Sequence, residues 1–122
     1  MQMLNLDTHI LVRALAGELL PSEETLLKRN RWSVSAIVLW ELAKLVQPGQ
    51  VELDLVDREV IRTLNRVRIW PIDLAVAIAS TRLDFMGDPA DELIAATRIV
   101  QNVPLLTRDR TILGSRIVPL AS

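Results

Sequence analysis

The sequence predicts an α/β protein, a three-layer α/β/α sandwich with a short, mostly parallel central sheet. Two observations support this prediction: short apolar runs alternate with segments of helical spacing, and no internal repeat or low-complexity tract interrupts the alternation. Strands separated by helices of this length are joined by right-handed crossovers, which cover a parallel sheet with helices on both faces. The chain has 122 residues, 50% of them hydrophobic, so residues 1–122 are expected to form one domain around one core.

Short apolar segments are expected to form the strands, at 3–6, 32–34, 68–70, 103–106 and 116–118. Between the first two strands, apolar residues with helical spacing cover 8–16, and Gly17 ends that pattern. A second helix is expected to start at Pro21, because proline favours the first helical position. Glu23 and Glu24 then place negative charge in its first turn, where the helix dipole favours it.

Further helices are expected between the later strands. Ser35 suits the N-cap of a helix that runs to about residue 46, and Asp54 or Asp57 can start one that runs to about residue 66. Asp88 is a natural N-cap with Pro89 at the first helical position. The remaining helical segments are 74–85, 89–100 and the short turn 110–113.

The composition excludes several kinds of site. The chain has no cysteine and one histidine, His9, so a disulfide, a catalytic thiol and a typical zinc site lack their residues. The formal net charge is -1, so any binding of polyanions has to be local. Twelve arginines and only two lysines carry the positive charge, and arginine suits bidentate contact with phosphate. Because no apolar run reaches about 18 residues, a soluble cytoplasmic protein without a membrane span is expected.

Four acids occupy positions that helix and strand formation alone rarely require: Asp7 and Asp109 after predicted strands, Asp91 in the first turn of a helix, and Glu41 inside an apolar helix. Ligands of open parallel sheets bind beyond the carboxyl ends of the strands, so Asp7 and Asp109 are expected at one edge. The helix that carries Glu41 is expected to be buried over most of its surface. Mg²⁺ and Mn²⁺ prefer oxygen ligands, and the four acids together predict a site for such a cation.

Each of these residues also has a structural interpretation. Glu41 can form an ion pair with Lys44, three residues further along the helix. Asp88 and Asp91 can cap the free amides of a helix start, and for Asp88 capping is the preferred interpretation. Two threonines beside the strand-end acids, Thr8 and Thr107, can orient carboxylates or be ordinary capping and strand residues.

Four motifs follow one another along almost the whole chain. They are Leu4-Asn5-Leu6-Asp7-Thr8-His9, Ser33-Val34-Ser35-Ala36 with Trp40-Glu41, Asp88-Pro89-Ala90-Asp91-Glu92-Leu93-Ile94-Ala95-Ala96-Thr97, and Leu105-Leu106-Thr107-Arg108-Asp109. Each motif alone is unspecific, whereas the four in this order resemble a PIN-domain ribonuclease of the VapC toxin type. One departure is His9, because relatives often have asparagine after the Asp-Thr pair.

The resemblance implies a small parallel sheet flanked by helices, a cluster of acids that binds one or two Mg²⁺ or Mn²⁺ ions, and hydrolysis of RNA phosphodiesters. The residues that match the catalytic and metal-binding acids of the family are Asp7, Glu41, Asp91 and Asp109. Asp88 matches a further acid of one subgroup, and its role as ligand or cap stays open. The resemblance also implies a homodimer and a cognate antitoxin that blocks the acidic pocket, with a basic side chain.

Three arginines near the acids, Arg13, Arg108 and Arg110, are candidates to guide RNA, with surface solubility or local ion pairing as the alternative. His9 can contact RNA or carry a proton, and can equally be a surface or capping residue. A stripe of arginines at 58, 62 and 66 can hold phosphate or form a solvated helix face. The three tryptophans lie in or near predicted core elements, so base stacking on an exposed aromatic platform is not expected.

Other enzyme classes fit less well. A phosphatase of the haloacid dehalogenase type would need a second acid two residues after Asp7, where His9 stands. A receiver domain would need a lysine late in the chain, whereas Lys28 and Lys44 lie early. The four glycines form no phosphate-binding loop. The alternative that stays open is a non-catalytic PIN-like module that binds RNA or a protein partner without cutting RNA.

Overall fold

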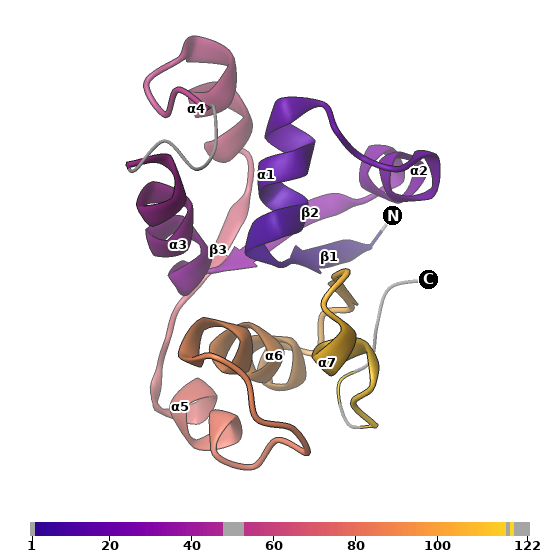
Figure 1. Ribbon diagram of the computed structural model, residues 1–122, viewed down its shortest axis with the longest axis vertical. Helices are drawn as coiled ribbons and strands as arrows, with labels where there is room; N and C mark the ends of the chain where they lie inside the picture. Colours follow the sequence, from indigo (N-terminus) through magenta and orange to yellow (C-terminus); the bar gives the residue numbers. More distant parts are fainter. Residues whose placement is uncertain (1, 48–52, 117, 119–122) are drawn as a thin grey trace.

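The computed structural model describes residues 2–47, 53–116 and 118, and its centre is a four-stranded parallel sheet. The strands are β1 (Met3–Leu6), β2 (Arg31–Ser35), β3 (Arg68–Trp70) and β4 (Leu105–Leu106). Their order across the sheet is β3-β2-β1-β4, so β1 lies between β2 and β4 (Figure 1). The carboxyl ends of β1 and β4 therefore lie side by side, since Leu6 pairs with Leu106.

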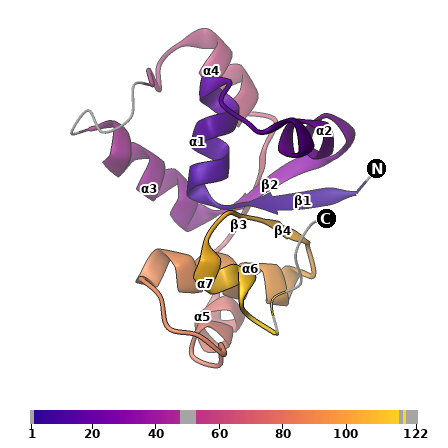
Figure 2. The same ribbon diagram turned by 45° about the vertical axis from the view of Figure 1, so that its right-hand side comes forward.

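Helices cover both faces of this sheet, as Figures 1 and 2 both show. On one face lie α1 (Thr8–Ala16), α2 (Pro21–Arg29), α3 (Ala36–Val46) and α4 (Arg58–Leu64). On the other face lie α5 (Leu74–Ser80), α6 (Pro89–Gln101) and α7 (Arg110–Leu113). The predicted three-layer α/β/α sandwich with a parallel sheet is confirmed. None of the helices in the described part of the chain combines the length and apolar character needed to cross a bilayer.

Capping side chains set several helix starts where the sequence predicts them. The hydroxyl of Ser35 accepts a hydrogen bond from the amide of Ile37 at 3.4 Å, at the start of α3. Of the two candidates for α4, Asp57 is the N-cap, since its carboxylate accepts from the amide of Glu59 at 3.0 Å. Asp54 instead closes the preceding turn by accepting from the amide of Val56 at 3.0 Å.

The helix predicted over 74–85 is shorter in the structure, because α5 ends at Ser80. The Ser80 hydroxyl donates to the carbonyl of Ala77 at 2.6 Å, and the Thr81 hydroxyl donates to the carbonyl of Ile78 at 2.7 Å. These hydroxyls donate to carbonyls that would otherwise accept hydrogen bonds only from amides one turn further along the helix. The prediction of a helix to residue 85 is therefore wrong.

The predicted C-terminal strands also differ from the structure. β4 comprises only Leu105–Leu106, although the carbonyl of Pro104 still accepts from the amide of Asn5 at 2.8 Å. In the predicted strand 116–118, Arg116 and Val118 belong to no strand, and residue 117 lies outside the described residues. The amide of Arg116 donates to the carboxylate of Asp84 at 2.7 Å, so it is not available to a sheet ladder.

The central strand β1 carries a buried amide side chain. Asn5 is fully buried, and within the described residues neither its oxygen nor its nitrogen has a hydrogen-bond partner. An unpaired buried amide costs free energy, whereas leucine has the same branching and no polar atoms. We therefore expect Asn5→Leu to raise the free energy of unfolding by about 1 kcal/mol in urea denaturation. A destabilised Asn5→Leu protein would mean that the amide is hydrogen-bonded in solution.

Candidate active site

Three of the five predicted acids are the N-caps of helices that start at the carboxyl edge of the sheet. The Asp7 carboxylate caps α1 by accepting from the amide of Ile10 at 2.9 Å. Asp88 caps α6, and Asp109 caps α7 by accepting from the amide of Ile112 at 3.0 Å. Capping thus explains why each acid stands at a helix start, and the fold brings these starts to the same edge.

These helix starts surround a cavity of about 330 Å³ that contains all five predicted acids. The cavity is lined by Asp7, Thr8, His9, Arg13, Glu41, Asp88, Asp91, Arg108 and Asp109. Asp7 and Asp109 therefore meet at one edge, as the strand-end rule predicts. Asp88, which caps α6 by accepting from the amide of Asp91 at 2.9 Å, is both a cap and part of the lining.

Two threonine hydroxyls hold carboxylates of the cavity. Thr8 donates to Oε1 of Glu41, and Thr107 donates to Oδ2 of Asp7. Thr107 also accepts from the amide of Asp109 at 2.9 Å, so it connects two of the acids. Both threonines are buried, and each hydrogen bond restricts the rotamers of the acid that accepts it.

Helix α3 is more exposed than the sequence predicts. Only Val38 and Leu42 of α3 are buried, and 58% of Trp40 is exposed, so the expectation of burial over most of the helix was wrong. The expectation that the tryptophans lie in or near the core fails for Trp40 for the same reason. Lys44 lies with its ammonium 5.7 Å from the centre of the Trp40 ring. Glu41 is half-buried and is held by the Thr8 hydroxyl.

The acids around the cavity repel one another, and Asp91 shows the effect most clearly. Burial raises the pKa of Asp91 to about 7, together with the negative charges of Asp88, Asp109, Glu41 and Asp7. Burial also raises the pKa of Asp7, although hydrogen bonds to its carboxylate act in the opposite direction. Near neutral pH the cavity therefore concentrates negative charge that a cation would stabilise.

The residue types of this cavity suit a divalent metal ion, but its side chains are too far apart to hold one as they stand. Within the described residues, no group of three or more acids or histidines is arranged to hold a metal ion as it stands. The donor set consists of carboxylates, which are the ligands that Mg²⁺ and Mn²⁺ prefer. The acids that would hold such an ion are Asp7, Glu41, Asp91 and Asp109, with Asp88 beside them. Their carboxylates would have to move closer together to share one ion.

The candidate RNA-contacting residues are placed differently from one another. His9 and Arg13 both line the cavity, and both also line a neighbouring one of about 750 Å³. Arg108 lines the acidic cavity, with its guanidinium paired to Glu23 of α2. Arg110 is an exposed residue at the start of α7 and is not among the residues that line the cavity. The sequence showed Glu23 only as a first-turn acid, because its partner lies 85 residues further along the chain.

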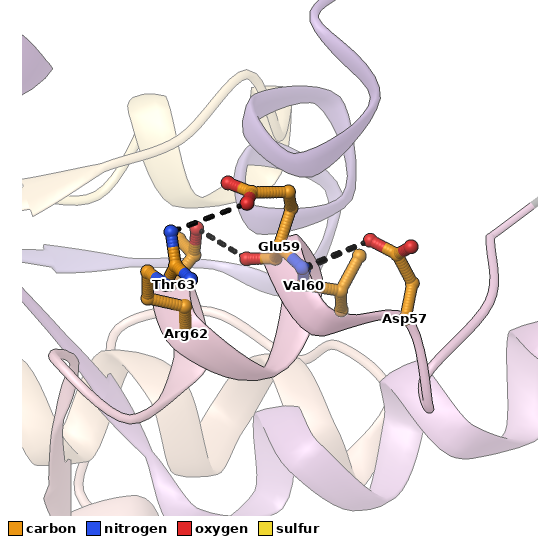
Figure 3. Close-up of polar contacts among 5 residues, drawn as sticks. All are labelled: Asp57, Glu59, Val60, Arg62 and Thr63. Atoms are coloured by element: carbon orange, nitrogen blue, oxygen red, sulfur yellow. Dashed lines mark hydrogen bonds and ion pairs between the residues drawn. The ribbon is translucent and has the colours of Figure 1, made fainter.

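Of the arginine stripe, Arg58 and Arg62 lie on α4 and Arg66 follows its end, and all three are exposed. Arg62 forms an ion pair with Glu59 at 3.3 Å, with both side chains mostly exposed (Figure 3). The hydroxyl of Thr63 donates to the carbonyl of Glu59 at 2.9 Å in the same view. These local contacts favour the interpretation of a solvated helix face.

The PIN-domain family pattern matches residues 5–113, which include every acid of the cavity. This chain belongs to the PIN-domain family. The sequence of the PIN domain is 36% identical over 87 residues to Ribonuclease VapC22 from Mycobacterium tuberculosis (strain ATCC 25618 / H37Rv), covering 69% of this chain and 67% of that protein. The predicted membership in the family is confirmed.

Solved structures share the fold of this PIN domain at low sequence identity. VapBC2 from Rickettsia felis, bound to a DNA fragment from its promoter, matches with a TM-score of 0.72 at 23% identity over 99% of this chain and 98% of that chain. DNA-bound VapBC from Salmonella typhimurium matches with a TM-score of 0.69 at 17% identity over the same shares of the two chains. A toxin-antitoxin complex from Klebsiella pneumoniae matches with a TM-score of 0.67 at 18% identity, over 91% of each chain. At these identities the matches establish the fold.

Proposed function

We propose that this PIN domain is an endoribonuclease that hydrolyses RNA phosphodiesters with Mg²⁺ or Mn²⁺. The observation that carries the proposal is the acidic cavity, in which burial, together with the neighbouring carboxylates, raises the pKa of Asp91 to about 7. Carboxylates that destabilise one another in this way gain from a bound cation. The name of the relative Ribonuclease VapC22 supports the choice of RNA as substrate.

In this proposal the residues of the chain divide the work between holding a cation and placing the substrate. Asp7, Glu41, Asp91 and Asp109 hold the ion, and the hydroxyls of Thr8 and Thr107 fix the carboxylates of Glu41 and Asp7. When bound, a divalent ion would supply a hydrolytic nucleophile at neutral pH and neutralise charge on the scissile phosphate. The half-buried Arg13 lies in the cavity wall, where its guanidinium can attract the RNA backbone toward the acids.

The direct test is cleavage of cellular RNA by the purified protein. Cleavage is expected with Mg²⁺ or Mn²⁺, is expected to stop in EDTA, and should return when the metal is added back. Mapping new RNA 5′ ends in cells that produce the protein would identify the sites. A protein that cuts none of the cellular RNAs with either metal would support the alternative, a PIN domain that binds without cutting.

We further propose that the protein is the toxin of a toxin–antitoxin pair and acts in the cytoplasm, where its RNA substrate lies. The similar structures named above are complexes of such pairs. The cavity of about 750 Å³ next to the acidic one supports this role. It combines apolar residues such as Leu15 and Leu45 with the acids Glu18 and Asp54. Such a lining suits an antitoxin segment with apolar and basic side chains, one of which would reach the acidic cavity.

A homodimer is also proposed, and helix α5 is the surface that supports it. The sequence of α5 contains no charged residue, and only Val76 is buried, whereas 74% of Leu74 and 43% of Ile78 are exposed. Exposed apolar residues that gather on one surface are a mark of interaction sites. A second copy is the occupant we propose, because family resemblance implies a dimer.

Leu74→Glu is expected to convert the dimer to a monomer, because it places a charge in the centre of the proposed interface. The measurement is the molar mass in solution by light scattering after size-exclusion chromatography. Val56→Glu is the matched control, because Val56 is 79% exposed and lies in the turn before α4. A wild-type monomer, or a Leu74→Glu protein that stays dimeric, would contradict the proposed interface.

A further inference from the structure

Glu23 is a buried acid outside the cavity. It is the third residue of α2 and is 6% exposed. Its Oε1 accepts a hydrogen bond from the amide of Leu20 at 2.9 Å, which caps the helix. Helix capping alone does not account for the burial of a full negative charge, because a buried carboxylate needs a charged or hydrogen-bonding partner for both oxygens.

The partner of Glu23 is Arg108, in the segment between β4 and α7. Nε of Arg108 donates to Oε2 of Glu23 at 2.6 Å, and a terminal nitrogen donates to Oε1 at 2.5 Å. This is the bidentate arrangement in which a guanidinium fixes a carboxylate plane. The hydrogen bonds from Arg108 lower the pKa of Glu23, so the pair stays ionised at neutral pH. The other ion pairs found in the described parts of the chain, Lys28 with Glu24 and Arg62 with Glu59, are mostly exposed.

Arg108 stands between two residues that contact the acidic site. Thr107 donates to the carboxylate of Asp7 and accepts from the amide of Asp109 at 2.9 Å. Asp109 lines the cavity and caps α7. Because the backbone links these residues directly, fixing the side chain of Arg108 restricts the positions of both of its neighbours.

We propose that Glu23 is a positioning residue that holds Arg108 and, through it, places Thr107 and Asp109 at the metal-binding acids. The inference rests on the proposed metal-dependent nuclease function. In this arrangement two of the five N–H groups of the Arg108 guanidinium are used in the hydrogen bonds to Glu23. The role we assign to this bidentate pair is to fix the segment between β4 and α7.

Glu23→Gln is the most direct test, because glutamine keeps the size of the side chain and the oxygen that caps Leu20. It loses the negative charge and one acceptor for Arg108. Arg108→Lys changes the other side of the pair, since lysine keeps the charge but not the bidentate geometry. Glu24→Gln is the matched control: it removes the same charge from the next residue, whose ion pair with Lys28 at 3.1 Å is exposed.

Three measurements separate positioning from a general loss of stability or from RNA binding. Amide hydrogen exchange across 105–113 reports the order of the segment without metal or RNA. Mn²⁺ titration followed by electron paramagnetic resonance gives the affinity for the ion. Cleavage kinetics give kcat and KM for RNA, and all are measured well below the unfolding midpoint of each variant.

If Glu23 positions the segment, Glu23→Gln and Arg108→Lys will each speed exchange in 105–113 and weaken Mn²⁺ affinity by about 10-fold or more. Both will lower kcat with little change in KM. The kcat of the double variant will be no lower than that of either single variant. Glu24→Gln will match the wild type. Unchanged exchange and Mn²⁺ affinity in Glu23→Gln, or a rise in KM alone in Arg108→Lys, would overturn the inference. A wild type that binds no Mn²⁺ would instead refute the proposed function. Hydrogen exchange would still test whether the Glu23–Arg108 pair orders the segment.

Discussion

Asp7→Asn is expected to reduce metal-dependent RNA cleavage by about 100-fold or more while the protein stays folded. The substitution removes a negative charge that the proposed cation needs. Asparagine keeps the oxygen that accepts from the amide of Ile10 and can donate from its nitrogen to the hydroxyl of Thr107. Because burial raises the pKa of Asp7, folding disfavours its charged form, and the variant should unfold at the same or a higher temperature without metal.

The control for Asp7→Asn is the same substitution at another helix start. Asp73 caps α5 by accepting from the amide of Val76 at 3.0 Å, and it is exposed. Asp73→Asn should therefore cleave RNA at the wild-type rate, so that loss of a capping charge alone cannot explain an inactive Asp7→Asn protein. Initial cleavage rates on one RNA substrate at saturating Mn²⁺ make the comparison. Wild-type cleavage by Asp7→Asn would remove Asp7 from the proposed site.

The parts of the fold and site that the sequence predicts well depend on short stretches of chain. Helix starts such as Ser35 and Asp88 follow from local capping chemistry, and the meeting of Asp7 with Asp109 follows from the parallel order of the strands. The hydrogen bonds that orient the acids are less local. Thr8 is beside Asp7 in sequence but holds Glu41, and Thr107 holds an acid 100 residues away.

Features that depend on distant contacts or on competition between hydrogen bonds are not predictable in the same way. The Glu23–Arg108 pair joins residues 85 positions apart, and either residue alone has an ordinary explanation as a first-turn acid or a surface arginine. Trp40 reads as a core residue because aromatic side chains are usually buried, yet it is 58% exposed. The end of α5 at Ser80 depends on two hydroxyls that take up helix carbonyls.

Without metal, the protein is expected to lose stability as the pH rises from about 4 to about 7. The carboxyl group of Asp91 has a pKa near 3.8 in the unfolded chain and about 7 in the folded protein. Between these values the folded protein binds the proton more tightly than the unfolded chain, so raising the pH favours unfolding. Allowing for partial screening by solvent, the loss should be about 1–2 kcal/mol. Urea unfolding in EDTA at pH 5 and pH 8 measures this change in the free energy of unfolding.

Outside the cavity, the carboxylates with altered pKa values act at lower pH, so the loss of stability in this interval comes from the cavity acids with raised pKa values, Asp91 and Asp7. Hydrogen bonds lower the pKa of Glu23 and Asp84, so their contributions are present at neutral pH and are lost only as the pH falls below their ordinary values of 4.5 and 3.8. Asp91→Asn removes the group with the larger shift and should therefore reduce the dependence of stability on pH between 5 and 8.

Saturating Mn²⁺ is expected to reverse the loss of stability at pH 8, because the ion binds the cavity of the folded protein and has no comparable site in the unfolded chain. At about 100 times its dissociation constant, the ion should stabilise the protein by about 2.7 kcal/mol. The gain should be smaller at pH 5, where a protonated Asp91 competes with the ion, and it should shrink in Asp91→Asn at both pH values. Equal free energies of unfolding for the metal-free wild type at pH 5 and pH 8 would show that folding does not raise the pKa of Asp91. A wild type that Mn²⁺ stabilises at neither pH would show that they hold no cation, and the proposed hydrolytic chemistry would then lack its metal.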